Sequence, residues 1–372
     1  MTEAHLMALT AAKGIKPTAS NISRLGKEFG IEAGLWAISQ LKLREKALKK
    51  FELAEEMFFV GQALEQSSHE EVARYHGSLF PEGVLVADLT CSIGSDLIAL
   101  AKRGPAIGFD LDAERIWCAK KNLEVHGLDS QVLAADSMEI EWDFEYAFVD
   151  PARRVGSRRT LSIEEFQPNP PLIASRFNNL KLGVMKLTPM LQDDILESLG
   201  SRIEFVSHHG ECKEALVFGG TEVGEPGKWA VHIESGERLG VAPVGSTVDS
   251  PLEFIFDPDP ALIRVHGLGN LGASGLGSSS YLTAADIGDS IKHKAWRKAY
   301  QVLHSGVFDV GEIKRRLKDL GCSQPELKQS GANLDLIQLQ KKLKQPGQEI
   351  FNVLFYKVGK SLRYAIAKKI NE

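Results

Sequence analysis

The feature that most limits the folds open to this chain is a regular alternation of short apolar runs and amphipathic stretches in its middle part. The amphipathic stretches at 96–102 and 113–126 are predicted helices, and Gly127 ends the second one. Strand–helix–strand alternation favours a parallel sheet covered by helices on both faces. The last two apolar runs flank a short polar turn, so we expect them to pair antiparallel at the sheet edge. The strand candidates are 84–89, 106–110, 131–135, 146–149, 183–187, 203–206 and 215–218.

The regions on either side of this alternation have a different character. Residues 1–80 are predicted to be helical, because Ala, Leu, Glu and Lys dominate and apolar residues recur at near-helical spacing. Within them, Ser67 or Ser68 is expected to cap a helix over 68–79. Residues 281–305 also read as helical. We therefore predict four parts: an N-terminal helical region (1–80), an α/β sheet domain (81–250), a connecting helical and loop segment (251–310) and a small α+β domain (311–372).

Length and composition exclude several classes of protein. The 372 residues are 43% hydrophobic and 25% charged, an ordinary balance for a globular chain. No apolar window approaches the roughly 20 residues that cross a bilayer, and the N-terminus lacks a basic start followed by an apolar block. The four cysteines lie far apart without a CxxC pair, which disfavours a disulfide framework or a cysteine zinc site. We expect a cytoplasmic protein with no membrane contact and no metal.

The charge is unevenly distributed along the chain. Residues 311–372 contain 13 Lys and Arg against 6 Asp and Glu, whereas the whole chain has a net charge of −5. A basic tail on an acidic body favours contact between the tail and a polyanion. A solvated helical face would give the same composition, so charge alone leaves both interpretations open.

Acidic residues follow four successive strand candidates. The first candidate ends at Asp88, and a turn of small residues, TCSIGS, leads from it into the next helix. The second candidate ends at Asp110, while Asp136 and Asp150 follow the third and fourth. In an open α/β sheet, ligands bind at the carboxyl ends of the strands, near the point where the strand order reverses. The sequence therefore predicts a ligand site at this edge, although Asp residues also cap loops without binding anything.

The acids also indicate which ligand fits. An acid at the tip of the second strand can accept both hydroxyls of a ribose, and Asp136 is placed to meet an adenine amino group. Carboxylates repel a pyrophosphate, and no basic residue interrupts the first turn. This argues against NAD and ATP and favours S-adenosylmethionine, whose sulfonium is positive.

Several motifs together resemble the class I S-adenosylmethionine-dependent methyltransferases, and in particular the bacterial methyltransferases that carry a THUMP-like C-terminal domain. In that family the first turn reads approximately D-L-x-C-G-I-G-G-D, which here is DLTCSIGSD over 88–96. The family's D-P-A-R-R motif is present at 150–154, and its EPDPA-like segment is DPDPA at 257–261. Two family glycines are replaced by Ser92 and Ser95, which crowds the turn. The resemblance implies a Rossmann-like methyltransferase sheet and a THUMP-like domain at 311–372.

The resemblance also implies roles for individual residues. Asp150 and the Pro151 carbonyl would accept hydrogen bonds from a target NH2 group, as in methyltransferases that modify an exocyclic amine. Arg153 stands where such enzymes usually have a base-stacking aromatic, and arginine can stack on a base or hold a phosphate. The expected catalytic residues are Asp150, Pro151 and Arg153. The expected cofactor-binding residues are Asp88, Thr90, Cys91, Ser92, Gly94, Asp110, Leu111, Asp136, Ser137 and Asp150.

A cluster of arginines just beyond the DPARR motif favours a nucleic-acid substrate. Arg153, Arg154, Arg158 and Arg159 are predicted to meet RNA phosphates, and tRNA or rRNA is the expected partner. Ion pairs with nearby glutamates are the alternative. For the protein as a whole, the leading hypothesis is an RNA methyltransferase. The alternative is a weak or inactive methyltransferase-fold protein that binds RNA, motivated by Ser92, Ser95 and the missing aromatic.

Two weaker signals are set aside. The segment 267–272 matches GxGxxG, but a Gly/Ser-rich loop follows it rather than a helix, so the dinucleotide fingerprint fails on context. Cys91 is a possible nucleophile of the kind used in cytosine C5 methylation. We expect it instead to be a small residue packed under the first turn.

Overall fold

The computed structural model describes residues 1–153, 162–288 and 291–370 of the chain. It divides into two compact units. The first unit is made of Met1–Ile203 and Leu216–Pro226, and the second of Glu204–Ala215 and Gly227–Glu372. The boundary between the units falls inside one β-hairpin rather than at residue 250.

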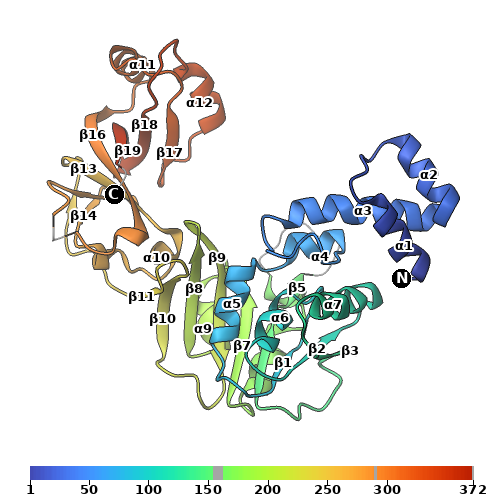
Figure 1. The fold of residues 1–372 in the computed structure, drawn as a ribbon. Helices are drawn as coiled ribbons and strands as arrows, with labels where there is room; N and C mark the ends of the chain where they lie inside the picture. Colours follow the sequence, from blue (N-terminus) through green and yellow to red (C-terminus); the bar gives the residue numbers. More distant parts are fainter. Residues whose placement is uncertain (154–161, 289–290, 371–372) are drawn as a thin grey trace. The chain divides into compact units, whose positions relative to one another are not determined.

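The first unit begins with five helices, which confirms the helical prediction for residues 1–80 (Figure 1). They are α1 (Glu3–Ala12), α2 (Ala19–Phe29), α3 (Ile31–Ala47), α4 (Gly61–Gln66) and α5 (Glu70–Ser78). The first three pack around a small apolar core of their own. The predicted cap of α5 is wrong, because His69 caps this helix: the Glu71 amide donates to its Nδ1 at 3.3 Å.

A parallel sheet forms the centre of the first unit. Its strands are β1 (Val86–Asp88), β2 (Ala106–Asp110), β3 (Gln131–Ala134), β4 (Tyr146–Val149) and β7 (Leu182–Leu187), in the spatial order β7-β4-β1-β2-β3. Every neighbouring pair in this order is parallel. The sheet therefore reverses its order between β1 and β4, as in Rossmann-like folds.

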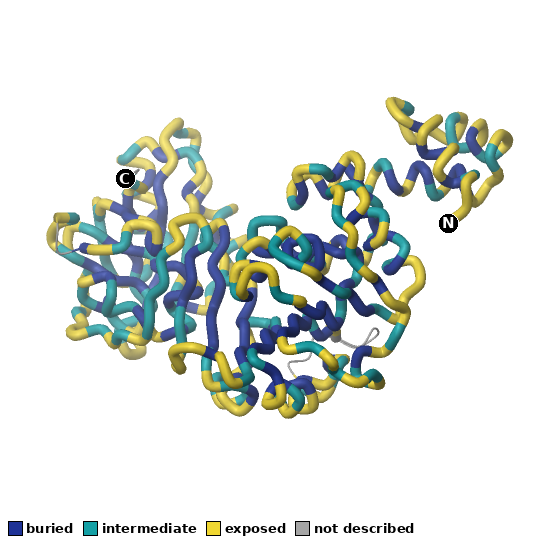
Figure 2. Tube along the Cα trace, turned by 60° about the horizontal axis from the view of Figure 1, so that its bottom comes forward, coloured by how far each residue is buried: buried dark blue, intermediate teal, exposed yellow. Residues whose placement is uncertain are grey.

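Helices connect the parallel strands and cover the sheet (Figure 1). Between β1 and β3 lie α6 (Ser95–Ala101) and α7 (Ala113–Val125), which pack against each other, and α5 packs against α6. Around β7 lie α8 (Pro170–Phe177) and α9 (Asp193–Leu199). The central strands are buried on both faces, so they appear dark blue in Figure 2. Ala147, Phe148 and Val149 of β4 have no solvent-exposed surface, as continuous apolar runs in a parallel sheet require.

The sheet continues beyond β7 into a nine-stranded order, β11-β10-β8-β9-β7-β4-β1-β2-β3. A two-residue link joins β8 (Arg202–His208) to β9 (Glu211–Gly219), which permits only antiparallel pairing. Both link residues have positive φ, 54° for His209 and 72° for Gly210, as tight hairpins prefer. The prediction that this pair forms the sheet edge is wrong, because β10 (Gly227–His232) and β11 (Glu237–Gly240) extend the sheet further.

The second unit contains an eight-stranded sheet in the order β12-β14-β15-β13-β16-β19-β18-β17. Helices α11 (Val310–Asp319) and α12 (Leu336–Leu343) share an apolar core with its C-terminal strands. The short helix α10 (Pro260–Arg264) follows β13. The strands are β12 (Thr247–Val248), β13 (Phe254–Pro258), β14 (Ser274–Leu276), β15 (Leu282–Ala284), β16 (Arg297–Val307), β17 (Glu326–Gln329), β18 (Asn352–Val358) and β19 (Ser361–Ile370).

This sheet corrects one sequence prediction. Residues 251–310 are not a connecting helical and loop segment, because four strands of the sheet, β13 to β16, lie within them. The range 281–305, predicted as a helix, contains β15 and most of β16 instead. Since β16 pairs with β13 on one side and β19 on the other, tertiary pairing outweighs a local composition of Ala, Lys and Leu that favours helix.

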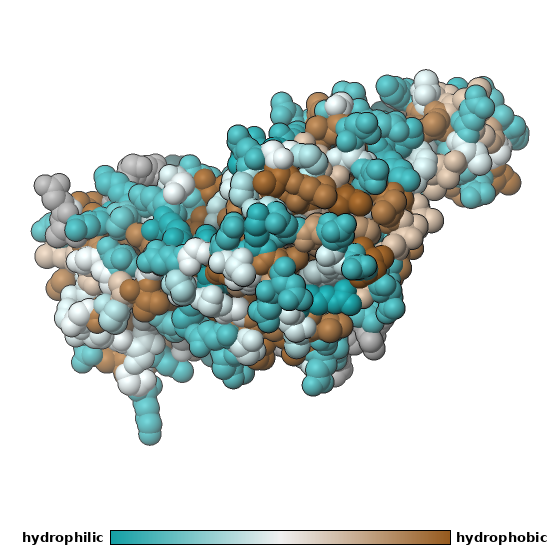
Figure 3. Space-filling view, turned by 90° about the horizontal axis from the view of Figure 1, so that it is seen from below, coloured by the Kyte–Doolittle hydropathy of each residue, from teal (hydrophilic) through white to brown (hydrophobic). Residues whose placement is uncertain are grey.

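The surface is mixed in polarity. On the face seen in Figure 3, hydrophilic residues cover most of the area and apolar ones gather in a band. Single large apolar side chains such as Leu85 and Leu172 are exposed, which is ordinary for a globular protein. Among the residues that the structure describes, no helix combines the length and the apolar composition that a bilayer crossing needs.

Candidate functional site

The four predicted acids lie at one edge of the parallel sheet. Asp88 is the last residue of β1 and Asp110 the last of β2, while Asp150 follows β4 directly and Asp136 lies two residues beyond β3. Because these strands are parallel, their carboxyl ends share one edge, with the reversal of strand order between β1 and β4. The fold thus places these residues where Rossmann-like proteins bind ligands.

Hydrogen bonds tie the turn after β1 to both neighbouring strands. The Thr90 amide donates to Asp88 Oδ1 at 3.1 Å, and the Asp150 amide donates to Thr90 Oγ1 at 2.8 Å. On the other side, the Cys91 amide donates to the Phe109 carbonyl at 2.8 Å. The turn is therefore held in one conformation between β2 and β4.

Two residues of this turn have left-handed backbone. Ser92 has φ 50° and Gly94 has φ 91°, and helix α6 begins immediately afterwards. A Cβ on Gly94 would lie 3.3 Å from Ala119 Cα, so the turn packs directly against α7. Ser92 stands where the first-turn motif of the similar methyltransferases has a glycine. It adopts a backbone conformation that is unusual for residues with a side chain.

Gly94→Ala is expected to destabilise the protein by about 2 kcal/mol, because left-handed backbone costs a non-glycine residue about 1–2 kcal/mol and the new methyl meets the α7 backbone. Gly127→Ala is a matched control, since Gly127 has φ 67° but no neighbour within 4 Å of the added Cβ. Chemical denaturation measures both variants. Equal losses would show that the contact with α7 carries no cost.

Asp110 shapes the turn and is half-buried. Its carboxylate accepts the Ser92 amide at 3.1 Å and the Asp112 amide at 2.8 Å. Leu111, the next residue, is 72% exposed and offers an apolar surface beside the carboxylate.

Beyond β3, the two predicted residues differ in exposure. Asp136 is exposed and its carboxylate accepts the Met138 amide at 2.9 Å. Ser137 is buried, and its carbonyl accepts the Trp142 indole N–H at 2.7 Å. Of the two side chains, only that of Asp136 is open to a ligand.

Asp88 has the most unusual environment of the four acids. It is only 1% exposed. Burial raises the pKa of this carboxyl well above its ordinary value, and the nearby charges of Asp96, Asp150 and Asp110 add to the effect. Within the described part of the chain, its Oδ2 has no hydrogen-bond partner although it is buried. A buried carboxylate oxygen without a partner is costly, and a cationic ligand would relieve that cost.

Asp150 is paired with a lysine that the sequence analysis did not identify. Lys186, on the neighbouring strand β7, places its Nζ 2.7 Å from Asp150 Oδ2. The same Nζ donates to Ser68 Oγ at 3.1 Å. The available signal was a lysine inside the otherwise apolar run 183–187, which a buried strand does not contain without a partner.

The pairing continues into the interior. Ser68 Oγ donates to Asp96 Oδ2 at 3.0 Å, and Asp96 Oδ1 lies 2.7 Å from His76 Nδ1. Burial alone would raise the pKa of Asp96, but the charge and hydrogen bond of His76 outweigh it, so the pKa is lowered. The fully buried His76 ring stacks on Phe148 of β4. Asp150 is thus connected through Lys186 and Ser68 to a buried ion pair.

Cys91 is poorly suited to act as a nucleophile. Its side chain is buried, and burial, followed by the charges of Asp88 and Asp110, raises the pKa of the thiol well above its usual range. A Cβ on Gly108 would lie 3.0 Å from the Cys91 Sγ, so the thiol packs closely against β2. This agrees with a packing role under the turn.

The residues after Asp150 are described only in part. Pro151 is buried, and the backbone of Ala152–Arg153 forms β5, which pairs with β6 (Phe166–Gln167). The predicted RNA-binding residues Arg154, Arg158 and Arg159 lie outside the described residues.

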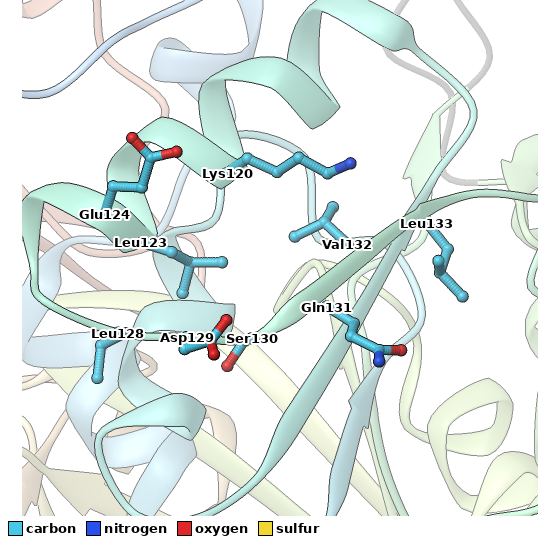
Figure 4. Close-up of a pocket in the computed structure, with 9 residues that line it drawn as sticks. All are labelled: Lys120, Leu123, Glu124, Leu128, Asp129, Ser130, Gln131, Val132 and Leu133. Carbon is cyan, nitrogen blue, oxygen red and sulfur yellow. The ribbon is translucent and has the colours of Figure 1, made fainter.

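A surface hollow of about 360 Å³ lies away from this edge (Figure 4). Residues at the end of α7 and along β3, among them Lys120, Glu124 and Gln131, line it. None of the four acids contributes to its lining, so it is separate from the candidate ligand site.

Comparisons with known proteins bear on the fold and on the predicted class of enzyme. No protein-family model matches the chain. The chain is 28% identical over 336 residues to an uncharacterized S-adenosylmethionine-dependent methyltransferase of Mycobacterium tuberculosis, covering 87% of this chain and 93% of that protein. A shorter match, 34% over 76 residues, is to a tRNA (uracil(54)-C(5))-methyltransferase of Pyrococcus furiosus and covers 20% of this chain and 18% of that protein.

A solved structure matches nearly the whole chain. The crystal structure of a candidate methyltransferase from Porphyromonas gingivalis W83 superposes with a TM-score of 0.79, at 19% identity, over 99% of this chain and 98% of that one. The chain therefore has the Rossmann-like α/β fold of the class I methyltransferases, as predicted. The name of the curated relative agrees with the predicted methyltransferase activity and with the predicted cofactor.

Proposed function

We propose that this protein is an S-adenosylmethionine-dependent methyltransferase that modifies RNA. The observation that carries the proposal is the buried Oδ2 of Asp88 at the carboxyl edge of the sheet, which has no hydrogen-bond partner among the described residues. S-Adenosylmethionine carries two cationic groups, its α-ammonium and its sulfonium, and a buried carboxylate at the first strand tip can compensate positive charge. Asp110 and the exposed Leu111 would hold the ribose and the apolar face of the nucleoside.

The turn that would bind the cofactor is held in place by its neighbours. Gly94 leaves no side chain where the turn meets α7, and Asp110 holds the Ser92 amide in place. When bound, the cofactor supplies an electrophilic methyl group. Asp150 and Pro151, at the adjoining strand tip, would position the acceptor, since orientation alone removes a large part of a bimolecular barrier.

RNA is the substrate class that the remaining features favour. Residues 311–372 carry a strong excess of basic side chains, and arginines cluster after the DPARR motif. The partial match to a tRNA methyltransferase points the same way. We propose that these basic residues, in a THUMP-like role for the C-terminal region, hold tRNA or rRNA phosphates, and that the protein works in the cytoplasm.

Asp150→Ala is expected to abolish methyl transfer, because the acceptor loses its positioning carboxylate, while S-adenosylmethionine binding persists. Nucleoside mass spectrometry of RNA from cells with and without the gene identifies the product, and calorimetry follows the cofactor. Asp143→Ala removes an exposed aspartate of the same unit and serves as the control. Transfer at the wild-type rate in Asp150→Ala would reject the assigned role.

The same experiments test the alternative, an inactive RNA-binding protein. Unchanged nucleosides in cells that lack the gene, together with RNA binding that ignores the cofactor, would favour it. A small-molecule or protein substrate would show itself through substrate binding with no steep salt dependence, unlike RNA.

A further inference from the structure

The pairing of Asp150 with Lys186 bears on the chemical class of the acceptor, which the motif resemblance relates to an exocyclic amine. Lys186 Nζ lies 2.7 Å from Asp150 Oδ2, and its side chain is only 14% exposed. A group that hydrogen-bonds to Asp150 Oδ2 lies within about 6 Å of this ammonium, because two hydrogen bonds of about 3 Å separate them. The acceptor site therefore contains a positive charge as well as a negative one.

The Asp150 carboxylate lies closer to the acceptor and by itself would oppose an anionic acceptor, and the ammonium of Lys186 offsets that charge. The contribution of the ammonium therefore favours one kind of acceptor over the other. A neutral amine becomes cationic as it takes a methyl group, and an ammonium nearby opposes the developing charge. An acceptor that first loses a proton is anionic when it reacts, and the same ammonium stabilises it. Opposite charges within about 4–6 Å shift a pKa by about 1–3 units in favour of the charged form, which is a tenfold to thousandfold effect on the reactive fraction.

We propose, on the basis of the proposed function, that the acceptor is an acidic N–H or O–H group of RNA, and that Lys186 promotes its ionisation. The acceptor's proton passes to water before transfer. The electron pair left on nitrogen or oxygen forms the new bond to the methyl carbon, and the C–S bonding pair remains on the departing sulfur. A ring N–H of a base and a ribose hydroxyl share this chemistry.

Other titratable groups lie near Lys186, so a rate measured at a single pH value does not isolate the effect of the lysine charge. Asp150, which follows β4, and Asp96 of α6 interact with Lys186 directly. Asp88 of β1 and His76 of α5 interact in turn with Asp96, and His69 caps α5 next to Ser68. Lys186→Arg keeps the positive charge amid the same neighbours, whereas Lys186→Met removes it.

The pH dependence of kcat is the decisive measurement. With total RNA from cells that lack the gene as the substrate, kcat of the wild type should rise with pH. This rise is the ascending limb of the pH profile. Lys186→Met should shift this limb upward by about one pH unit or more and lower kcat at neutral pH about tenfold or more. Lys186→Arg should keep the limb near its wild-type position. A loss of kcat in Lys186→Met without a shift of the limb would show a structural role and overturn the proposal.

The matched control is Lys181→Met, at the opposite end of β7, where Lys181 pairs with the exposed Glu145. It should change neither kcat nor the limb. A readout without cofactor is thermal unfolding of Asp150→Asn, Lys186→Met and the double variant. Non-additive shifts in Tm confirm that the pair is formed in solution, and additive shifts would contradict it.

The identity of the methylated product distinguishes a failure of this inference from a failure of the proposed function. A methylated ring nitrogen, with a limb that levels off in the alkaline range, identifies a base. A 2′-O-methyl product, with a limb that keeps rising, identifies the ribose. An N-methylated exocyclic amine overturns the inference but leaves the methyltransferase assignment intact, whereas absence of both cofactor binding and transfer removes the assignment itself.

Discussion

Asp88→Asn is expected to weaken S-adenosylmethionine binding about a hundredfold or more and to leave the fold intact. The buried Oδ2 of Asp88 has no partner among the described residues, so a cationic ligand group is its natural complement. Truncating one member of a buried charge pair costs about 2–5 kcal/mol, and 1.4 kcal/mol corresponds to tenfold. Calorimetric titration measures the affinity, and Asp143→Asn is a control with the same change of charge at an exposed position.

The pH dependence of binding gives an independent check on Asp88. Its pKa is raised in the ligand-free protein, and a bound cation favours the ionised form. Binding should therefore release protons, and affinity should increase with pH until the raised pKa is passed. Titrations in two buffers of different ionisation enthalpy detect the released protons. Binding of undiminished strength in Asp88→Asn, without proton release in the wild type, would show that Asp88 does not contact the cofactor.

The position of the candidate site follows from the sequence more directly than its internal contacts do. Apolar runs that end in Asp88, Asp110 and Asp150 indicate parallel strands, and parallel strands bring their carboxyl ends to one edge. The proximity of these acids can therefore be predicted without knowing the strand order. The predicted strand ranges agree with the observed strands because buried parallel strands are apolar on both faces.

The contact between Asp150 and Lys186 depends on information that the linear pattern lacks. The two residues become neighbours only because β7 lies beside β4, with Val149 opposite Met185. Ser68 likewise reads as a helix cap, yet it hydrogen-bonds to Asp96, 28 residues away in sequence. Polar residues with long-range partners resemble ordinary caps or surface residues until the fold is known.

Amino-acid composition also gave a wrong prediction in the second unit. Residues 281–305 contain Ala, Lys and Leu at helix-compatible positions, but Ala299, Tyr300 and Val302 lie in a long strand paired on both sides. Helix propensity is a weak preference of a few tenths of a kcal/mol per residue, and two-sided strand pairing with a buried face exceeds it.

Asp96→Asn is expected to produce the largest loss of stability. Asp96 and His76 form a buried pair with 2.7 Å between Oδ1 and Nδ1, and the side chains are 10% and 0% exposed. Removing one partner from a buried ion pair costs about 3–5 kcal/mol. For a unit of about 200 residues this lowers Tm by about 10 °C. Thermal unfolding followed by circular dichroism at neutral pH measures the change.

The pH dependence of this loss has a definite sign. The pKa of Asp96 is lowered in the folded protein, so its stabilising contribution is complete above the unfolded carboxyl pKa, near 4, and disappears as the pH falls through the folded value. The gap in Tm between wild type and Asp96→Asn should therefore narrow in acid. Glu124→Gln breaks the exposed pair with Lys121 and should change Tm by at most a few degrees, since such pairs contribute about 0–1 kcal/mol. If Asp96→Asn behaved like Glu124→Gln, the buried pair would be unnecessary for the fold, and the ordered connection from His76 through Ser68 and Lys186 to Asp150 would lose its structural anchor.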